Sequence, residues 1–194
     1  MSAAAQSANQ SSELAPGERR IHVVQGEQHV DTSANVVLTT ILGSCVAACM
    51  RDPVAGVGGM NHFLLPHGEG TQTSASLHAG VHAMELLVNG LLQRGARRDR
   101  LEAKLFGGAR MIAGLTDIGR RNAEFAETFL QREGIAFAGG SLGGNHARRI
   151  QYWPGSGRAR QFLVERAEEK VFEAERRRAP APAAPADTGS LELF

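Results

Sequence analysis

The stretch LGSCVAACMRDPVAGVGGMNHFLLP, residues 42–66, contains both cysteines of the 194-residue chain. Residues 46–50 are small or apolar and predict a short strand, and residues 57–65 predict a second one. Between them lies the run RDPVAG, residues 51–56, which has the composition of a turn and a proline that sets φ to about −65°. The stretch therefore predicts an antiparallel hairpin.

The expected register of this hairpin brings a thiol and an imidazole together. If the loop is symmetric about Pro53 and Val54, Cys45 lies directly opposite His62. Side chains that face each other on antiparallel strands have Cβ atoms about 5 Å apart, so contact between the two is expected. Both faces of the hairpin are small or apolar, which favours a sheet that is covered on both sides.

A cysteine beside a histidine is a pattern of nucleophilic catalysis. A neutral imidazole accepts the thiol proton, and the imidazolium then holds the thiolate at neutral pH. Gly43 and Ser44 allow a sharp turn before Cys45, so that backbone N–H groups there could face a developing oxyanion. Thr39, six residues before Cys45, is a candidate for the group that orients the ring of His62.

Other interpretations of these residues stay open. A lone cysteine on an apolar strand is more often a small buried hydrophobe, and Cys49 is interpreted in this way. Cys45, Cys49 and His62 supply only three of the four ligands of a structural zinc site. A redox pair formed by the two cysteines is a further alternative. We expect neither a metal nor an organic cofactor.

The rest of the chain predicts short strands and two amphipathic helices. Glycine occurs 23 times, often in pairs, which indicates many tight turns. The expected helices span residues 74–94, with Ser74 or Ser76 as the N-cap, and residues 117–132. The expected strands are residues 21–25, 35–40, 101–106, 135–137, 146–153 and 158–165. Strands mixed with two helices indicate the α/β class.

The two ends differ from the middle in composition. Residues 1–19 are mostly Ala, Ser, Gln and Asn without an apolar period, so a disordered tail is predicted. Residues 20–178 form the expected globular domain, which includes an exposed helix over residues 167–178. Residues 179–194 form a Pro/Ala linker and a short tail, DTGSLELF. This tail is either a disordered end or a docking peptide.

Composition and charge limit the classes of function. The formal net charge is +1, with one Trp and one Tyr, so nucleic acid is not an expected partner. Residues 1–19 lack the basic and apolar regions of a signal peptide, and no apolar run is long enough for membrane insertion, so we expect neither a secretory signal nor a membrane span. Two cysteines without a secretory signal favour a reducing cytoplasm. Four of the other six histidines lie in or beside polar segments and are expected at the surface: His67, His78, His82 and His146.

Five blocks of sequence resemble a known family. LGSCVAACMRDP is followed by GGMNHFLLP, by LEAK and GGA over residues 101–109, by IG and RN over residues 118–122, and by GGN and AR over residues 143–148. In this order the blocks are similar to the bacterial chemoreceptor glutamine deamidases (CheD). The resemblance covers residues 21–165.

The resemblance implies a hydrolase that converts selected glutamine side chains of methyl-accepting chemotaxis proteins to glutamate and releases ammonia. It implies a Cys–His–Thr triad, which maps by position onto Cys45, His62 and Thr39. The implied fold is a layered β-sandwich flanked by helices, similar to the catalytic domain of deamidating bacterial toxins. Residues 78–80, HAG, depart from the usual start of the first long helix of the family.

The implied partners are the cytoplasmic helical bundles of chemoreceptors and, for some members, a CheY-P phosphatase (CheC). We expect a monomeric cytoplasmic protein. The alternative is a non-catalytic regulatory partner of a CheC-type phosphatase, in which the thiol site has no reaction to perform.

Overall fold

The computed structural model describes residues 14–66, 74–111 and 118–164. The expected helix over residues 167–178, the linker and the DTGSLELF tail lie outside the described residues. The helices are α2 (Ser74–Gln93), the short 3-10 helix η1 (Arg98–Arg100) and α3 (Ile118–Glu133). The strands are β1 (Arg19–His22), β2 (Gln28–Asp31), β3 (Val36–Leu42), β4 (Val46–Asp52), β5 (Val57–Asn61), β6 (Glu102–Gly107), β7 (Ala136–Leu142), β8 (Arg148–Trp153) and β9 (Arg158–Leu163).

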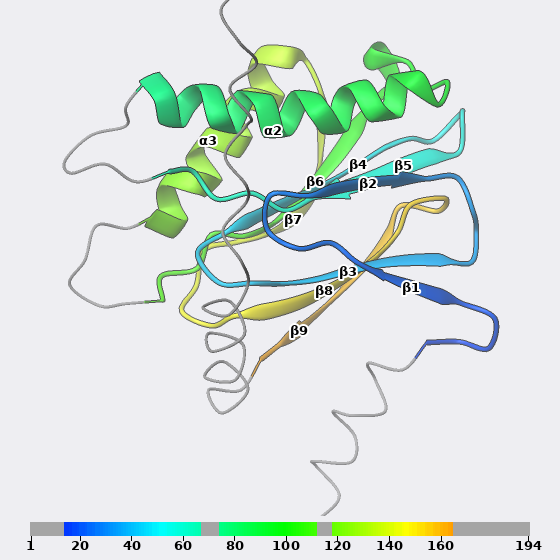
Figure 1. Cartoon of the computed structure of the whole chain (residues 1–194), viewed down its shortest axis with the longest axis horizontal. Coiled ribbons are helices and arrows are strands. Elements are labelled where there is room, and N and C mark those ends of the chain that lie inside the picture. The colour runs from blue at the N-terminus through cyan, green and yellow to red at the C-terminus, as the bar shows by residue number, and fades with distance from the viewer. Residues whose placement is uncertain (1–13, 67–73, 112–117, 165–194) are drawn as a thin grey trace, which may run out of the picture. The chain divides into compact units, whose positions relative to one another are not determined.

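The strands form two sheets that are stacked beneath a layer of helices (Figure 1). The four-stranded sheet has the order β1-β3-β8-β9, and the five-stranded sheet has the order β2-β5-β4-β6-β7. Helices α2 and α3 pack on the face of the five-stranded sheet that points away from the other sheet. The expected α/β fold, a layered β-sandwich flanked by helices, is confirmed.

Strand β4 shows why these layers form. Successive side chains of a strand point to opposite faces of its sheet. Val46, Ala48 and Met50 therefore pack with the apolar side chains of the helices. Ala47 and Cys49 point to the other face and pack with residues of the four-stranded sheet. Both faces of β4 are buried, as the small and apolar composition of the hairpin predicts.

The predicted register of the hairpin is wrong by two residues. Asp52 pairs with Val57 and Cys49 pairs with Met60, so the loop is symmetric about Val54 and Ala55. The centre of the loop lies one residue later in the chain than predicted, which moves each pairing partner by two residues. The loop has this position because Asp52 accepts hydrogen bonds from the backbone N–H groups of the turn itself. A shift of two residues leaves every side chain on its predicted face, because the side-chain period of a strand is two.

The helices were predicted more accurately than the first strands. The helix expected over residues 74–94 is α2, and the one expected over residues 117–132 is α3. The strand expected over residues 21–25 is wrong at both ends, because β1 begins at Arg19 and ends at His22. Strand β2 was not predicted, and Val30 is its one buried side chain. An edge strand with so few apolar residues carries little sequence signal.

The described structure includes part of the segment that was expected to be a tail. Glu18 accepts a hydrogen bond of 2.7 Å from the indole nitrogen of Trp153. The N–H of Arg19 donates to the carbonyl of Asn35 at 2.7 Å. Both bonds attach the chain before residue 20 to the four-stranded sheet. Among the described residues, no helix is both long and apolar enough to cross a membrane.

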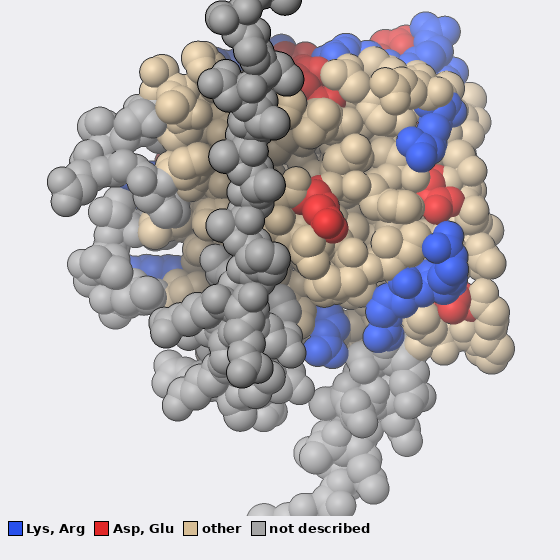
Figure 2. Space-filling model, viewed as in Figure 1, with Lys and Arg blue, Asp and Glu red and all other residues tan. Residues whose placement is uncertain are grey.

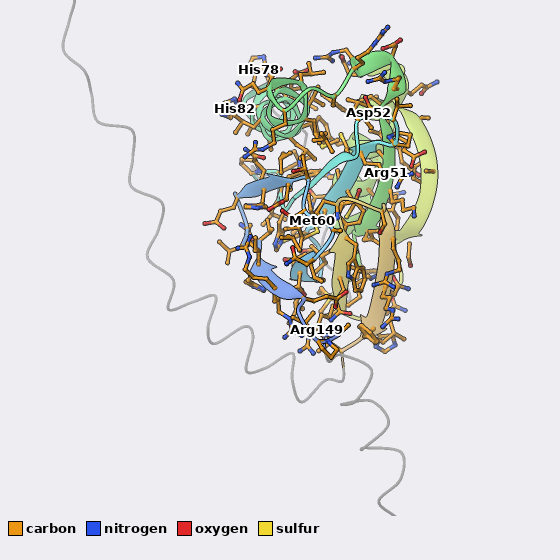
Figure 3. All side chains as sticks on the ribbon, turned by 90° about the vertical axis from the view of Figure 1, so that its right-hand side faces the viewer. Arg51, Asp52, Met60, His78, His82 and Arg149 are labelled. Atoms are coloured by element: carbon orange, nitrogen blue, oxygen red, sulfur yellow. The ribbon has the colours of Figure 1, made fainter. Side chains whose placement is uncertain are left out.

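Asp52 holds the far end of the hairpin and is fully buried (Figure 3). Its carboxylate accepts the N–H groups of Val54 and Ala55 at 2.9 and 3.0 Å. It also accepts the N–H of Arg97 at 2.9 Å and pairs with the guanidinium of Arg100 at 2.7 Å. Burial alone would raise the pKa of this carboxyl. The four donors lower it by more than burial raises it, so the pKa lies well below its ordinary value.

We predict that Asp52→Asn lowers the free energy of unfolding by about 1.5–3 kcal/mol at neutral pH, the usual worth of hydrogen bonds to a charged group. Because the folded pKa is depressed, this stabilisation is complete above the unfolded pKa of about 3.9 and is lost as the pH falls below it. Urea unfolding of both proteins at pH values from neutral to acid should therefore show a difference that shrinks in acid.

The matched control for this prediction is Asp99→Asn. The ion pair between Asp99 and Arg97 is exposed, with 64% of each side chain accessible. Its loss should cost less than about 1 kcal/mol, the upper range for a surface pair. Equal destabilisation by the two substitutions would contradict the role given to Asp52.

Candidate active site

The segment that carries Cys45 lies between β3 and β4 and is fixed by its carbonyl groups. The carbonyl of Gly43 accepts the N–H of Ala109 at 2.9 Å, and the carbonyl of Cys45 accepts the N–H of Gly108 at 2.8 Å. Gly107 has a φ of +108°, and a Cβ at this position would clash with the Cys45 carbonyl. A glycine is therefore required for the close approach of β6 to the thiol segment.

The third carbonyl of the segment is held by helix α3. The side-chain nitrogen of Asn122 donates to the carbonyl of Ser44 at 2.8 Å. The side-chain oxygen of Asn122 accepts the N–H of Leu65 at 3.0 Å. Asn122 is fully buried, so this one amide joins the chain before β4 to the chain after β5. It fixes the two sides of the site relative to one another.

These three hydrogen bonds set the directions of the N–H groups beside Cys45. In a trans peptide the carbonyl and the next N–H point in opposite directions. Because the carbonyls of Gly43 and Ser44 point to Ala109 and Asn122, the N–H groups of Ser44 and Cys45 point away from those two residues. The directions of these two backbone donors beside the thiol are therefore fixed.

The backbone of His62 is paired with the turn before β2. The N–H of His62 donates to the carbonyl of Glu27 at 3.0 Å, and its carbonyl accepts the N–H of Gly26 at 2.7 Å. On the other side, Val46 and Phe63 form an antiparallel bridge with two backbone hydrogen bonds. The backbone that carries the imidazole ring is therefore held by hydrogen bonds to two neighbouring segments.

The ring of His62 contacts the opposite sheet. Its Nδ1 lies 2.8 Å from the hydroxyl of Thr40 and 3.4 Å from the carbonyl of Val23. A carbonyl oxygen can only accept a hydrogen bond, so this pair of oxygens favours the tautomer that carries its proton on Nδ1. In that tautomer Nε2 is the proton acceptor.

The structure places Thr40, and not Thr39, at this ring nitrogen. The hydroxyl of Thr39 donates to the carbonyl of Ile150 at 2.8 Å. The carbonyl of Thr39 accepts the N–H of Val23 at 2.9 Å. Adjacent residues of β3 point to opposite faces of the sheet, and Thr40 is the one that faces His62. The hydroxyl of Thr39 therefore does not contact the ring, and the catalytic role of Thr39 stays a prediction.

Cys45 and His62 lie on the same face of the hairpin, but not directly opposite one another. The bridge between Val46 and Phe63 puts His62 opposite Ala47, so Cys45 is its diagonal neighbour. Diagonal neighbours have Cα atoms about 7–8 Å apart, within reach of a histidine side chain. Both residues are buried, Cys45 at 3% and His62 at 5% exposure. The thiol also donates to the side-chain oxygen of Gln25 at 3.4 Å.

Cys49 occupies the apolar layer between the sheets. Its side chain is buried among core residues, and this burial raises the pKa of its thiol well above the ordinary value. Both cysteines are free thiols. Within the parts of the chain that the structure describes, no group of three His, Cys, Asp or Glu residues is arranged to hold a metal ion.

The described histidines that were expected at the surface lie there. His78 and His82 are exposed on α2 (Figure 3), and His146 is exposed after β7. His67 lies outside the described residues. The face shown in Figure 2 has a largely uncharged centre, with basic and acidic side chains scattered near its right-hand edge.

Three residues of this site were not predicted from the sequence: Thr40, Gln25 and Asn122. Residues 36–42 are buried on both faces, so alternation does not show which of the two threonines faces the other sheet. Asn122 belongs to one of the blocks that carry the family resemblance, but nothing in its spacing indicates a contact with Ser44. Gln25 lies outside these blocks and has no local signal.

The fold and the site define a mixed α/β protein in which a thiol and an imidazole lie on one face of the same hairpin, between two sheets. A family model described as "CheD chemotactic sensory transduction" matches residues 64–161. Curated relatives named "Probable chemoreceptor glutamine deamidase CheD" are 56% identical over 178 residues in Rhizobium etli and 57% identical over 180 residues in Rhizobium meliloti. Each of these two matches covers 91% of this chain and 96% of the relative. The chain belongs to the CheD family.

More distant matches are found among solved structures. A Neisseria meningitidis protein of the DUF152 family model is 12% identical with a TM-score of 0.44, over 66% of this chain and 64% of that one. The hypothetical protein YfiH of Bacillus licheniformis is 14% identical with a TM-score of 0.40, over 66% of this chain and 61% of that one.

Proposed function

We propose that this chain hydrolyses the side-chain carboxamide of selected glutamine residues in chemoreceptors, giving glutamate and ammonia. Curated relatives at more than half identity carry this activity in their name. The observation that carries the proposal is the hydrogen bond of 2.8 Å between Thr40 and Nδ1 of His62, on the face of the hairpin that also presents Cys45. It fixes the orientation of the imidazole on that face.

In the proposed reaction Cys45 is the nucleophile and His62 is the base. Thr40 and the Val23 carbonyl hold the proton of His62 on Nδ1, so that Nε2 accepts the thiol proton. The two oxygens also stabilise the imidazolium that forms, because both can accept its Nδ1 proton. Thr40 is thus the third member of the triad, in the place that was first given to Thr39.

The thiolate attacks the carbonyl carbon of the substrate amide, forming a C–S bond and an oxyanion. The N–H groups of Ser44 and Cys45 are the proposed donors to this oxyanion, which gives Gly43 and Ser44 the role of shaping the oxyanion site. The imidazolium returns its proton to the leaving nitrogen as the C–N bond breaks, and ammonia departs. Water then hydrolyses the thioester with His62 as the base, and Cys45 is regenerated.

The substrate of this proposal is a side chain that projects from the cytoplasmic helical bundle of a receptor, so we place the reaction in the cytoplasm. A CheC-type phosphatase as a further partner and a monomeric state belong to the same proposal. The reaction as written uses only groups of the protein and water.

We predict that Cys45→Ala abolishes ammonia release and leaves the glutamines of a receptor cytoplasmic fragment unchanged. With the unmodified enzyme, each converted glutamine should gain about 1 Da, because an NH₂ group is replaced by OH. Mass spectrometry of receptor peptides before and after incubation measures this directly. Cys49→Ala is the matched control and should retain activity; conversion by Cys45→Ala would refute the proposal.

We further predict that Thr40→Val lowers kcat about tenfold or more, the equivalent of one lost hydrogen bond of about 1.4 kcal/mol. Thr39→Val removes the hydrogen bond to Ile150 instead, and should reduce stability by about 1 kcal/mol with little change in kcat. The rates come from ammonia release and the stabilities from urea unfolding. A larger loss of kcat in Thr39→Val than in Thr40→Val would contradict the reassignment.

A further inference from the structure

A glutamine of the chain itself lies against the proposed nucleophile. The thiol of Cys45 donates to the side-chain oxygen of Gln25, with Sγ and Oε1 separated by 3.4 Å. The side chain of Gln25 ends in a carboxamide, the same group that the enzyme is proposed to attack in its substrate. This similarity makes the position of Gln25 informative about where a substrate side chain binds.

A tight turn delivers Gln25 to this position. The N–H of Glu27 donates to the carbonyl of Val24 at 3.0 Å, and Gly26 has a φ of +89°. These features are those of a type II turn with Gln25 at its second position. The turn is attached to His62 through the N–H of Gly26 and the carbonyl of Glu27. The backbone of Gln25 is therefore fixed beside the site, while its side chain keeps three rotatable bonds.

Cys45 and Gln25 differ in their exposure to solvent. Cys45 is buried, with 3% of its surface accessible, whereas Gln25 is an exposed residue. The hydrogen bond between them is part-buried, so the carboxamide of Gln25 covers part of the thiol. A molecule that takes the place of this carboxamide at Sγ has to displace the side chain of Gln25.

We propose that the carboxamide of Gln25 occupies, in the resting protein, the place that the carboxamide of a substrate glutamine takes, and that the substrate displaces it. The inference rests on the proposed function for the identity of the displacing group. The contact places the amide oxygen at the thiol hydrogen, so it is a resting arrangement and not an attack on the amide carbon. A thiol is a weak donor, so the contact is readily exchanged.

The protein offers a matched pair of variants for a test. Gln25→Ala removes the carboxamide from the thiol. Gln28→Ala removes the same group three residues along, where the Gln28 side chain lies close to Gly90 of α2 and not at the site. Neither residue is assigned a step in the proposed reaction. Thermal unfolding of both variants establishes that they are folded.

The first measurement is the rate at which iodoacetamide alkylates Cys45 in the full-length protein, followed by mass spectrometry. It requires no receptor and no turnover. Gln25→Ala should react about two- to tenfold faster than the unmodified protein, the equivalent of one weak hydrogen bond. Gln28→Ala should react at the unmodified rate. An unchanged rate in folded Gln25→Ala would overturn the inference.

The second measurement is the steady-state deamidation of a receptor cytoplasmic fragment. Since the substrate no longer has to displace a side chain, Gln25→Ala should show a lower KM with no loss of kcat. A lower kcat at unchanged KM would mean that Gln25 takes part in the reaction itself. That result would overturn the inference that its carboxamide only occupies the place of the substrate carboxamide. If the unmodified protein deamidates nothing while Gln25→Ala is still alkylated faster, the proposed function has failed and Gln25 only covers the thiol.

Discussion

The hydrogen bond between Thr40 and His62 joins the two sheets at the place where the site lies. Thr40 belongs to β3 of the four-stranded sheet, and His62 follows β5 of the five-stranded sheet. The site therefore exists only when the sheets are stacked in the observed register. The buried side chains that stack them, such as Leu38, Met60 and Tyr152, are in this sense part of the machinery that positions the imidazole.

The thiol side of the site depends on a different set of contacts. The carbonyls of Gly43 and Cys45 each accept an N–H from the chain directly after β6, and the carbonyl of Ser44 accepts a donor from α3. Because these carbonyls are held, the N–H groups of Ser44 and Cys45 point the other way, and these are the groups that we propose as donors to the oxyanion. Asn122 also holds Leu65. The imidazole side and the thiol side of the site are thus connected through helix α3.

The sequence was sufficient for the face on which each residue of the hairpin lies, but not for the register. Period-two alternation depends only on local geometry, so Cys45 and His62 were correctly placed on one face. The register depends on Asp52, whose four donors come from the turn and from residues almost fifty positions away. The choice between Thr39 and Thr40 depends likewise on the face that β3 presents to the other sheet. Contacts between residues that are far apart in the chain leave no local pattern in a single sequence.

The central claim is that Thr40 and the Val23 carbonyl hold the proton of His62 on Nδ1 and leave Nε2 as the base. Proton–nitrogen correlation spectroscopy of protein labelled at its histidine nitrogens observes this tautomer directly, without any substrate. We expect neutral His62 to carry its proton on Nδ1, and Thr40→Val to weaken this preference. A neutral His62 with its proton on Nε2 in the unmodified protein would contradict it.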